Sequence, residues 1–138
     1  MNQVKRNPRL AVVMSKGQAG LLDRSFQAMS DTEELKTCGL AGITYQDSQS
    51  ADSYYIATDL GTYFGCRRAT GFLKSEWLPE FVPHAEVEQA ELLTPMPGIF
   101  LRCYRRGEGK HFLFFSFYLD DDPAHAAALG EAMGFDFK

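Results

Sequence analysis

Apolar positions follow a helical period near both ends of the chain. Leu22, Phe26 and Met29 recur at i, i+4 and i+7, which predicts a helix over residues 15–30. Residues 124–133 are rich in alanine, a strong helix former, and they follow an acidic run and a proline that suit a helix N-terminus. We therefore expect one helix before and one helix after the central part of the chain.

The central part of the chain has the two-residue period of β-strands. Glycine and proline turn signals separate seven expected strands, which cover residues 35–45, 54–58, 62–68, 72–78, 87–93, 99–105 and 111–119. We expect residues 46–53 to form a polar loop and Gly61 to supply a positive φ in the turn before the third strand. Pro79 and Pro83 should forbid regular strand pairing and form an irregular connection.

This order of elements predicts a mainly β (α+β) fold. No helix of useful length fits between the strands, so a parallel sheet of alternating strands and helices is excluded. We expect a seven-stranded antiparallel barrel or orthogonal sandwich with a C-terminal capping helix and an additional N-terminal helix. Residues 1–32 would form an N-terminal tail and helix that packs on the domain, and residues 33–138 would form the barrel with its C-terminal helix.

The last expected strand is apolar on both faces. One face carries Phe112, Phe114 and Tyr118, and the other carries Leu113, Phe115, Phe117 and Leu119. A strand with one face in water should alternate apolar and polar residues. An uncovered apolar face of this size would promote aggregation. We therefore expect the N-terminal helix or a second subunit to cover it.

Composition bears on location and on partners. The chain has 138 residues and a net charge of −4, with 14 Lys and Arg against 18 Asp and Glu. This charge argues against binding to nucleic acid and to anionic membranes. The three cysteines are far apart in sequence, so we expect buried, reduced thiols. The N-terminal apolar run is too short for a signal peptide, and no stretch is long enough for a membrane span, so we expect a cytoplasmic protein.

Two stretches resemble the bacterial pleckstrin-homology-like (PH-like) domain families. Residues 55–64, YIATDLGTYF, combine a strand that ends in Thr-Asp, a tight turn and an aromatic strand. Residues 77–87, WLPEFVPHAEV, place a proline and histidine segment before a strand that begins with an aliphatic residue. The resemblance covers about residues 33–134 and implies seven antiparallel strands followed by a helix. Its motifs locate strands and carry no chemistry, and the N-terminal helix departs from the minimal eukaryotic domain.

The best-known activity of the eukaryotic domains is phosphoinositide binding, which uses Lys and Arg around the first two strands. The corresponding residues 44–53 hold two aspartates and no basic residue. Multivalent phosphate requires charge-assisted donors. The resemblance therefore does not imply phosphoinositide binding for this chain.

Basic and aromatic residues gather where the sixth and seventh strands should form a hairpin. The candidate interaction surface comprises Arg102, Tyr104, Arg105, Arg106, Lys110, Phe112, Phe114 and Tyr118. A locally positive hairpin tip would suit an acidic partner. The alternative is a solvated tip whose charges discourage pairing between sheet edges.

The leading hypothesis is a non-catalytic interaction module that acts by protein–protein contacts or self-association. One alternative is a carrier that holds a small or lipid-like molecule in an aromatic-lined pocket. Another is an enzyme that uses Cys66, which precedes two arginines, or His84, which lies near Glu80 and Glu86. The histidines lack metal-ligand spacing and no phosphate-binding glycine loop is present, so we predict neither a metal nor a cofactor.

Overall fold

The computed structural model describes residues 24–25, 27–30, 32–46, 48–93, 98–117 and 123–136. Most of the helix expected over residues 15–30 lies outside these ranges, as do Tyr118 and Leu119. The elements of the described part are β1 (Leu35–Tyr45), β2 (Ser48–Thr58), β3 (Gly61–Gly71), β4 (Lys74–Pro83), the 3-10 helix η1 (His84–Glu86), β5 (Gln89–Leu93), β6 (Phe100–Tyr104), β7 (Leu113–Ser116) and the helix α4 (Pro123–Ala132).

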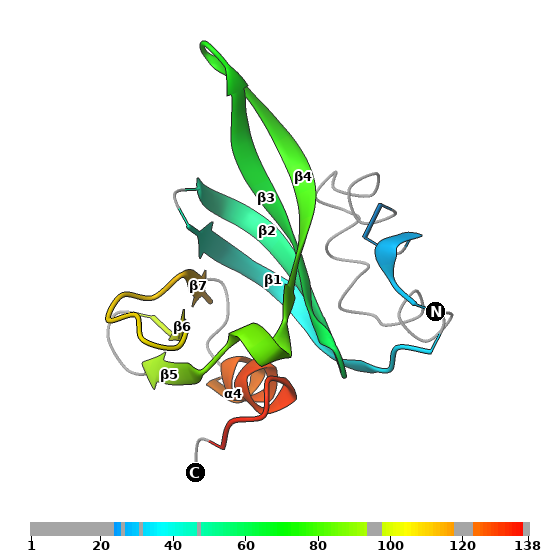
Figure 1. The fold of residues 1–138 in the computed structure, drawn as a ribbon, viewed down its shortest axis with the longest axis vertical. Coiled ribbons are helices and arrows are strands. Elements are labelled where there is room, and N and C mark those ends of the chain that lie inside the picture. The colour runs from blue at the N-terminus through cyan, green and yellow to red at the C-terminus, as the bar shows by residue number, and fades with distance from the viewer. Residues whose placement is uncertain are drawn as a thin grey trace.

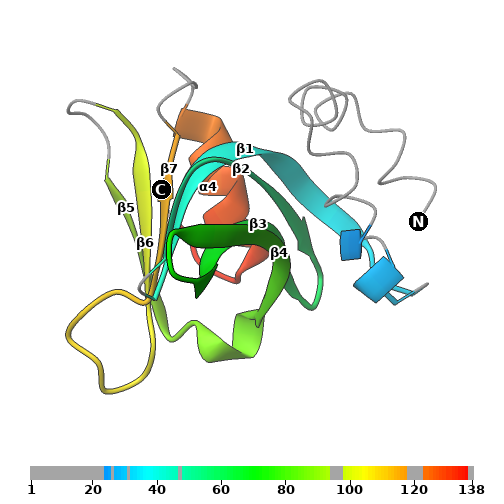
Figure 2. The ribbon, with the colours of Figure 1, turned by 90° about the horizontal axis from the view of Figure 1, so that it is seen from above.

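The strands form one antiparallel sheet in the order β4-β3-β2-β1-β7-β6-β5. The predicted mainly β, antiparallel fold with a C-terminal helix is confirmed. The expected closure into a barrel is wrong, because β4 and β5 are the two edges of the sheet and the sheet stays open. The sheet instead bends around α4, which contacts β1 and β2 as well as β5 and β6 (Figures 1 and 2).

The main core fills the space between the bent sheet and α4. Tyr55 packs edge-on against Phe115 and Phe117, with ring centroids 6.0 and 5.7 Å apart. Leu129 of α4 is fully buried in the same cluster. Burial of one such side chain contributes about 1.5–3 kcal/mol. This packing, rather than a closed ring of strands, excludes water from the interior.

The helix α4 ends in a glycine cap. Gly134 has a φ of +100°, a conformation that glycine adopts at little cost. The backbone N–H of Gly134 donates to the carbonyl of Glu131, and that of Phe135 donates to the carbonyl of Gly130. These bonds satisfy carbonyls that the last helical turn would leave without partners.

A second apolar cluster lies under the N-terminal segment. Met29 is buried against Tyr54 and Tyr63, and a hydrogen bond of 2.5 Å joins Ser25 Oγ to Tyr54 Oη. The described part of this segment therefore packs on β2 and β3. The described N-terminal residues lie away from the outer face of β7, which the N-terminal helix or a second subunit was expected to cover (Figures 1 and 2).

The polar loop expected over residues 46–53 is wrong, because β2 begins at Ser48 and pairs with β1 across a tight turn. Serines are tolerated here because their hydroxyl groups bond to the neighbouring strand. Ser53 Oγ donates to the carbonyl of Gly65 at 2.6 Å, and Ser50 Oγ accepts from the backbone N–H of Arg67 at 2.9 Å. Both serines are buried. Local polarity therefore gave no sign of the strand.

The irregular connection expected at Pro79 and Pro83 is also wrong. Both prolines lie within β4, where Pro79 pairs with Gly65 and Pro83 pairs with Gly61. β4 is an edge strand, so a residue without an N–H donor is tolerated on its unpaired side. The same prolines disfavour the addition of another strand at this edge.

Gly61 is the first residue of β3, and the expectation that it supplies a positive φ is wrong. Its φ is not among the positive values of this structure. A Cβ at this position would lie 2.5 Å from the Phe81 ring and 2.6 Å from the carbonyl oxygen of Val82. Glycine is required here by the close approach of β4.

Candidate functional site

Four rings form a continuous row on the outer face of β6 and β7. The Phe100 and Phe114 rings stack with centroids 5.4 Å apart, and the His111 ring lies 5.3 Å from Phe114. Tyr104 meets His111 edge-on at 6.3 Å. All four side chains are half-buried. We call Phe100, Tyr104, His111 and Phe114 the aromatic row.

His111 extends this row as a neutral ring. Burial lowers its pKa, and the nearby positive charges of Arg102 and Lys110 lower it further. The imidazole is therefore uncharged at neutral pH. It adds apolar, polarisable surface and not another cation.

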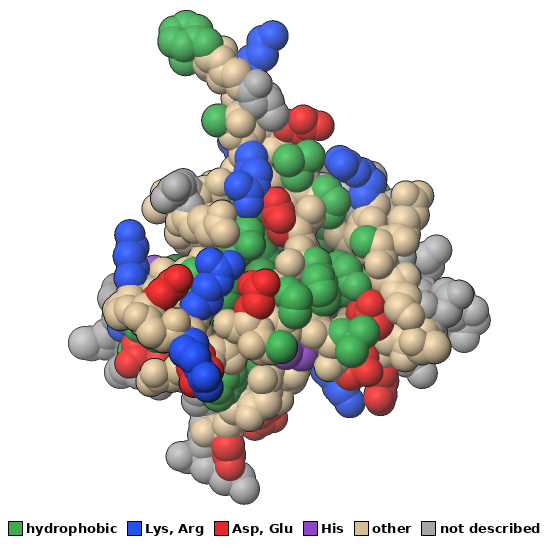
Figure 3. Space-filling model, viewed as in Figure 1, with side chains coloured by type: hydrophobic (Ala, Val, Ile, Leu, Met, Phe, Trp, Pro, Cys, Tyr) green, Lys and Arg blue, Asp and Glu red, His purple; other side chains and the backbone are tan. Residues whose placement is uncertain are grey.

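Two columns of opposite charge lie beside the aromatic row. Three arginines of the β6–β7 hairpin each face a glutamate of the η1–β5 segment at 3.2 to 3.4 Å: Arg102 with Glu91, Arg105 with Glu86, and Arg106 with Glu88. We call these arginines the basic column and these glutamates the acidic column. Figure 3 shows blue and red side chains side by side over this part of the surface.

The charge pairing changes the interpretation of the hairpin tip. The basic column, predicted as a locally positive patch, is largely neutralised by the acidic column. Within the described ranges, Lys110 has no ion-pair partner and remains exposed. Each ion pair is partly or largely exposed and contributes little stability on its own, about 1 kcal/mol or less. The ion pairs therefore contribute little to stability, and their main effect is on the distribution of charge over this surface.

The structure brings together five of the eight predicted surface residues: Arg102, Tyr104, Arg105, Arg106 and Phe114. Phe112 is not among them, because it is buried in the main core, 6.5 Å from the Tyr45 ring. The guanidinium of Arg105 covers its outer side at 4.2 Å from the ring centroid. Phe112 precedes β7, so the alternation of the strand does not extend to it.

The acidic column was missed from the sequence. Its members alternate with apolar or neutral residues ahead of and within β5, a pattern that is ordinary for an exposed strand. The register of β5 on β6 sets Glu91 opposite Arg102. Pairing the two predicted strands in antiparallel register would have revealed this one pair, whereas the other two pairs lie outside the register.

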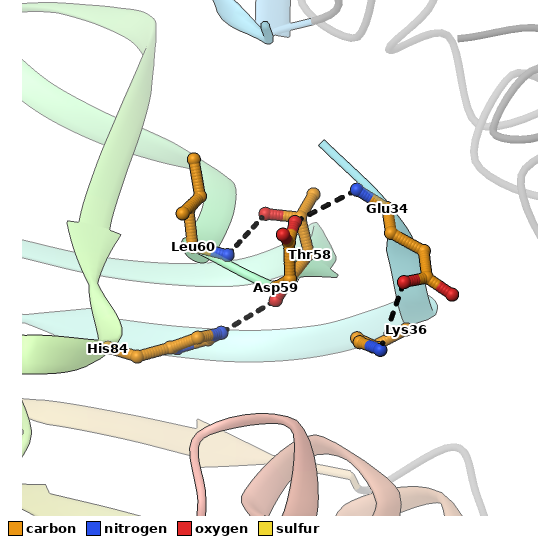
Figure 4. Close-up of polar contacts among 6 residues, drawn as sticks. All are labelled: Glu34, Lys36, Thr58, Asp59, Leu60 and His84. Carbon is orange, nitrogen blue, oxygen red and sulfur yellow. Dashed lines mark hydrogen bonds and ion pairs between the residues drawn. The ribbon is translucent and has the colours of Figure 1, made fainter. Parts of the chain in front are cut away.

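His84 holds a turn and does not pair with a carboxylate (Figure 4). Its Nε2 lies 2.7 Å from the carbonyl oxygen of Thr58, so Nε2 carries the proton. In the same turn, Asp59 Oδ1 accepts from the backbone N–H of Glu34 at 2.9 Å, and Thr58 Oγ1 accepts from that of Leu60 at 3.2 Å. These bonds tie the β2–β3 turn to η1 and to the start of β1.

The two glutamates expected near His84 have other partners. Glu80 binds Arg68 at 2.8 Å, and Glu86 binds Arg105 at 3.3 Å. The expected histidine–carboxylate pair is therefore not formed.

Cys66 and His84 lie far apart along the β3–β4 hairpin, because Cys66 is within β3 and His84 directly follows β4. Gly61 pairs with Pro83, and Cys66 lies five residues further along the strand, roughly 16 Å away. Cys66 is buried, and burial raises the pKa of its thiol. The structure thus does not bring these two groups into one cleft.

The described residues contain neither a recognisable metal site nor a membrane-spanning helix. Among the described residues, no group of three or more His, Cys, Asp or Glu is placed to hold a metal ion. In that same part of the chain, no helix has the length and apolar character needed to cross a membrane. The chain matches no family model, no curated protein and no solved structure.

Proposed function

We propose that this chain is a non-catalytic PH-like interaction module that acts through protein–protein contacts, with a second copy of the same chain on its aromatic row. The PH-like assignment is supported by the two sequence stretches and by the element order, seven antiparallel strands followed by a helix. The aromatic row is supported as a contact surface by its composition. Half-buried rings with a rim of arginine are typical of interface centres.

The observation that carries the choice of partner is the pair of charge columns. The basic column lies on β6 and the hairpin after it, and each of its arginines pairs with a glutamate of β5 or of the segment before β5. A two-fold axis along the boundary between the two columns would set the basic column of one copy against the acidic column of the other. Such a face is complementary to itself, which is what a two-fold symmetric dimer requires. The same contact would cover the exposed parts of the four rings.

Charge reversal tests this arrangement. Arg102→Glu combined with Arg106→Glu makes the basic column net acidic, with Arg105 as its remaining cation. Glu88→Arg combined with Glu91→Arg makes the acidic column net basic, with Glu86 as its remaining anion. We expect the wild-type chain to form dimers and each double variant alone to be monomeric, because like charges would face each other. An equimolar mixture of the two variants should form dimers again. Sedimentation velocity at low and high salt measures the oligomeric state of the wild type, of each double variant alone and of their mixture.

Lys36→Glu is the matched control, because Lys36 is an exposed surface lysine in β1, away from the β5–β6 face, and pairs only with Glu34 among the described residues. It should dimerise like the wild type. Recovery in the mixture also shows that both double variants are folded. A wild-type chain that stays monomeric at high micromolar concentration would refute self-association. So would variants that dimerise as strongly as the wild type.

A further inference from the structure

The β3–β4 hairpin ends in two exposed apolar side chains. Phe72 and Leu73 form the turn between the strands, and each is 90% exposed. The hairpin extends beyond the rest of the molecule in Figure 1, and its end is apolar with a basic side chain beside it in Figure 3. This tip is distinct from the aromatic row and its charge columns.

The fold does not explain these two residues. Leu73 has a φ of +57°, in the left-handed region that glycine, asparagine and aspartate favour in turns. A leucine in this conformation is strained. Neither side chain is buried in the domain to offset that strain. Local strain that does not serve folding is often kept for function.

We propose that the tip inserts Phe72 and Leu73 into the interfacial region of a lipid bilayer that carries anionic headgroups. Two adjacent side chains are far too small for a protein interface of ordinary size. A bilayer requires no complementary shape, and apolar side chains reach the boundary between headgroups and acyl chains. This inference does not depend on the proposed dimer.

The charges of the hairpin fit an anionic surface. Residues 67–77 hold the basic residues Arg67, Arg68 and Lys74 and one acidic residue, Glu76, and Arg68 is paired with Glu80 of β4 at 2.8 Å. Arg67 and Lys74 therefore keep the end of this hairpin positive in a chain with a net charge of −4. Lys74 follows the tip directly and lies at headgroup level when the tip is inserted. Arg67 lies five residues before Phe72, roughly 16 Å along the strand. At that height it is about two Debye lengths above the acyl boundary at physiological ionic strength, so Lys74 supplies the main attraction to the headgroups.

Vesicle binding tests the proposal. The probes are vesicles of phosphatidylcholine alone and of phosphatidylcholine mixed with phosphatidylserine. We expect the wild-type chain to co-sediment with the mixed vesicles and the Phe72→Ser/Leu73→Ser variant to bind at least tenfold more weakly. Lys74→Ser should weaken binding several-fold to the mixed vesicles only.

Leu60→Ser is the matched control, because Leu60 is another exposed leucine, in the β2–β3 turn. This variant should bind both vesicles like the wild type. The proposal is overturned if the wild-type chain binds neither vesicle or if the tip variant binds as well as the wild type. It is also overturned if the tip variant changes the sedimentation of the chain without vesicles, which would assign the tip to a second copy. Circular dichroism should show unchanged folding of the tip variant, because both side chains are exposed.

Discussion

Replacement of Gly61 by alanine tests the closest approach between two strands of the sheet. The added Cβ would lie 2.5 Å from the Phe81 ring and 2.6 Å from the Val82 carbonyl oxygen, whereas ordinary contacts begin at 3.4 Å. The Phe81 side chain is 37% exposed, so its ring can turn toward solvent. That movement gives up the contact with the Tyr63 ring, 4.5 Å away, which is worth about 0.5–1.5 kcal/mol.

The carbonyl of Val82 cannot move in this way, because it belongs to the backbone of β4. β3 and β4 would have to separate locally by roughly 0.8 Å, a case of overpacking that costs about 1–3 kcal/mol. Alanine recovers about 0.5–1 kcal/mol, because glycine loses more backbone entropy on folding. We therefore expect Gly61→Ala to lower the free energy of unfolding by about 2 kcal/mol.

Urea unfolding followed by circular dichroism measures this loss as a lower midpoint with an unchanged slope. Phe81→Ala removes the ring and leaves the carbonyl in place. If the backbone contact dominates, Gly61→Ala should still cost more than half as much in the Phe81→Ala background. A Gly61→Ala variant as stable as the wild type would show that the approach of β4 does not require glycine.

Two further predictions concern strain and alkaline pH. Leu73→Asn should raise the free energy of unfolding by about 0.5–1 kcal/mol, since asparagine tolerates a left-handed backbone; a melting temperature that does not rise by about 2–4 °C would contradict strain at this turn. Burial raises the pKa of Tyr54 from 10.0 to about 12 and that of Cys103 from 9.0 to about 12. Because these folded-state pKa values exceed the unfolded ones, the stability from both groups is present below about pH 9 and is lost as the pH rises toward 12. Tyr54→Phe should remove the part of this decline that begins at pH 10, about 2–3 kcal/mol in all, as measured by urea unfolding at stepped pH; an unchanged decline would contradict it.

Strands whose burial alternates could be predicted from the sequence alone. In β6 the side chains of Leu101 and Cys103 are buried and those of Phe100, Arg102 and Tyr104 are half-buried, as the alternation predicts. The C-terminal helix was predicted as well, because alanine and a proline at the helix N-terminus act through local backbone energetics. These features depend on residues that are neighbours in the chain.

The features that were missed depend on residues far apart in the chain. Ser50 and Ser53 look like loop residues until β3 supplies partners for their hydroxyl groups. Pro79 forbids a central strand, but it is compatible with an edge strand, and only the sheet order shows that β4 is an edge. Gly61 was expected to relieve backbone strain, whereas it makes room for Phe81, twenty residues later.

The candidate surfaces also depend on residues that are far apart in the chain, because the net charge does not show where the individual charges lie in the fold. A total of −4 argued against nucleic acid and anionic membranes as partners. The fold pairs three arginines with three glutamates on the β5–β6 face, which makes that face neutral overall and patterned. It also places Arg67, Arg68 and Lys74 on one hairpin with the acidic residues Glu76 and Glu80, of which Glu80 pairs with Arg68. A chain that is acidic overall can therefore present a neutral, self-complementary face and a positive, apolar tip, and each must be tested by variants of its own residues.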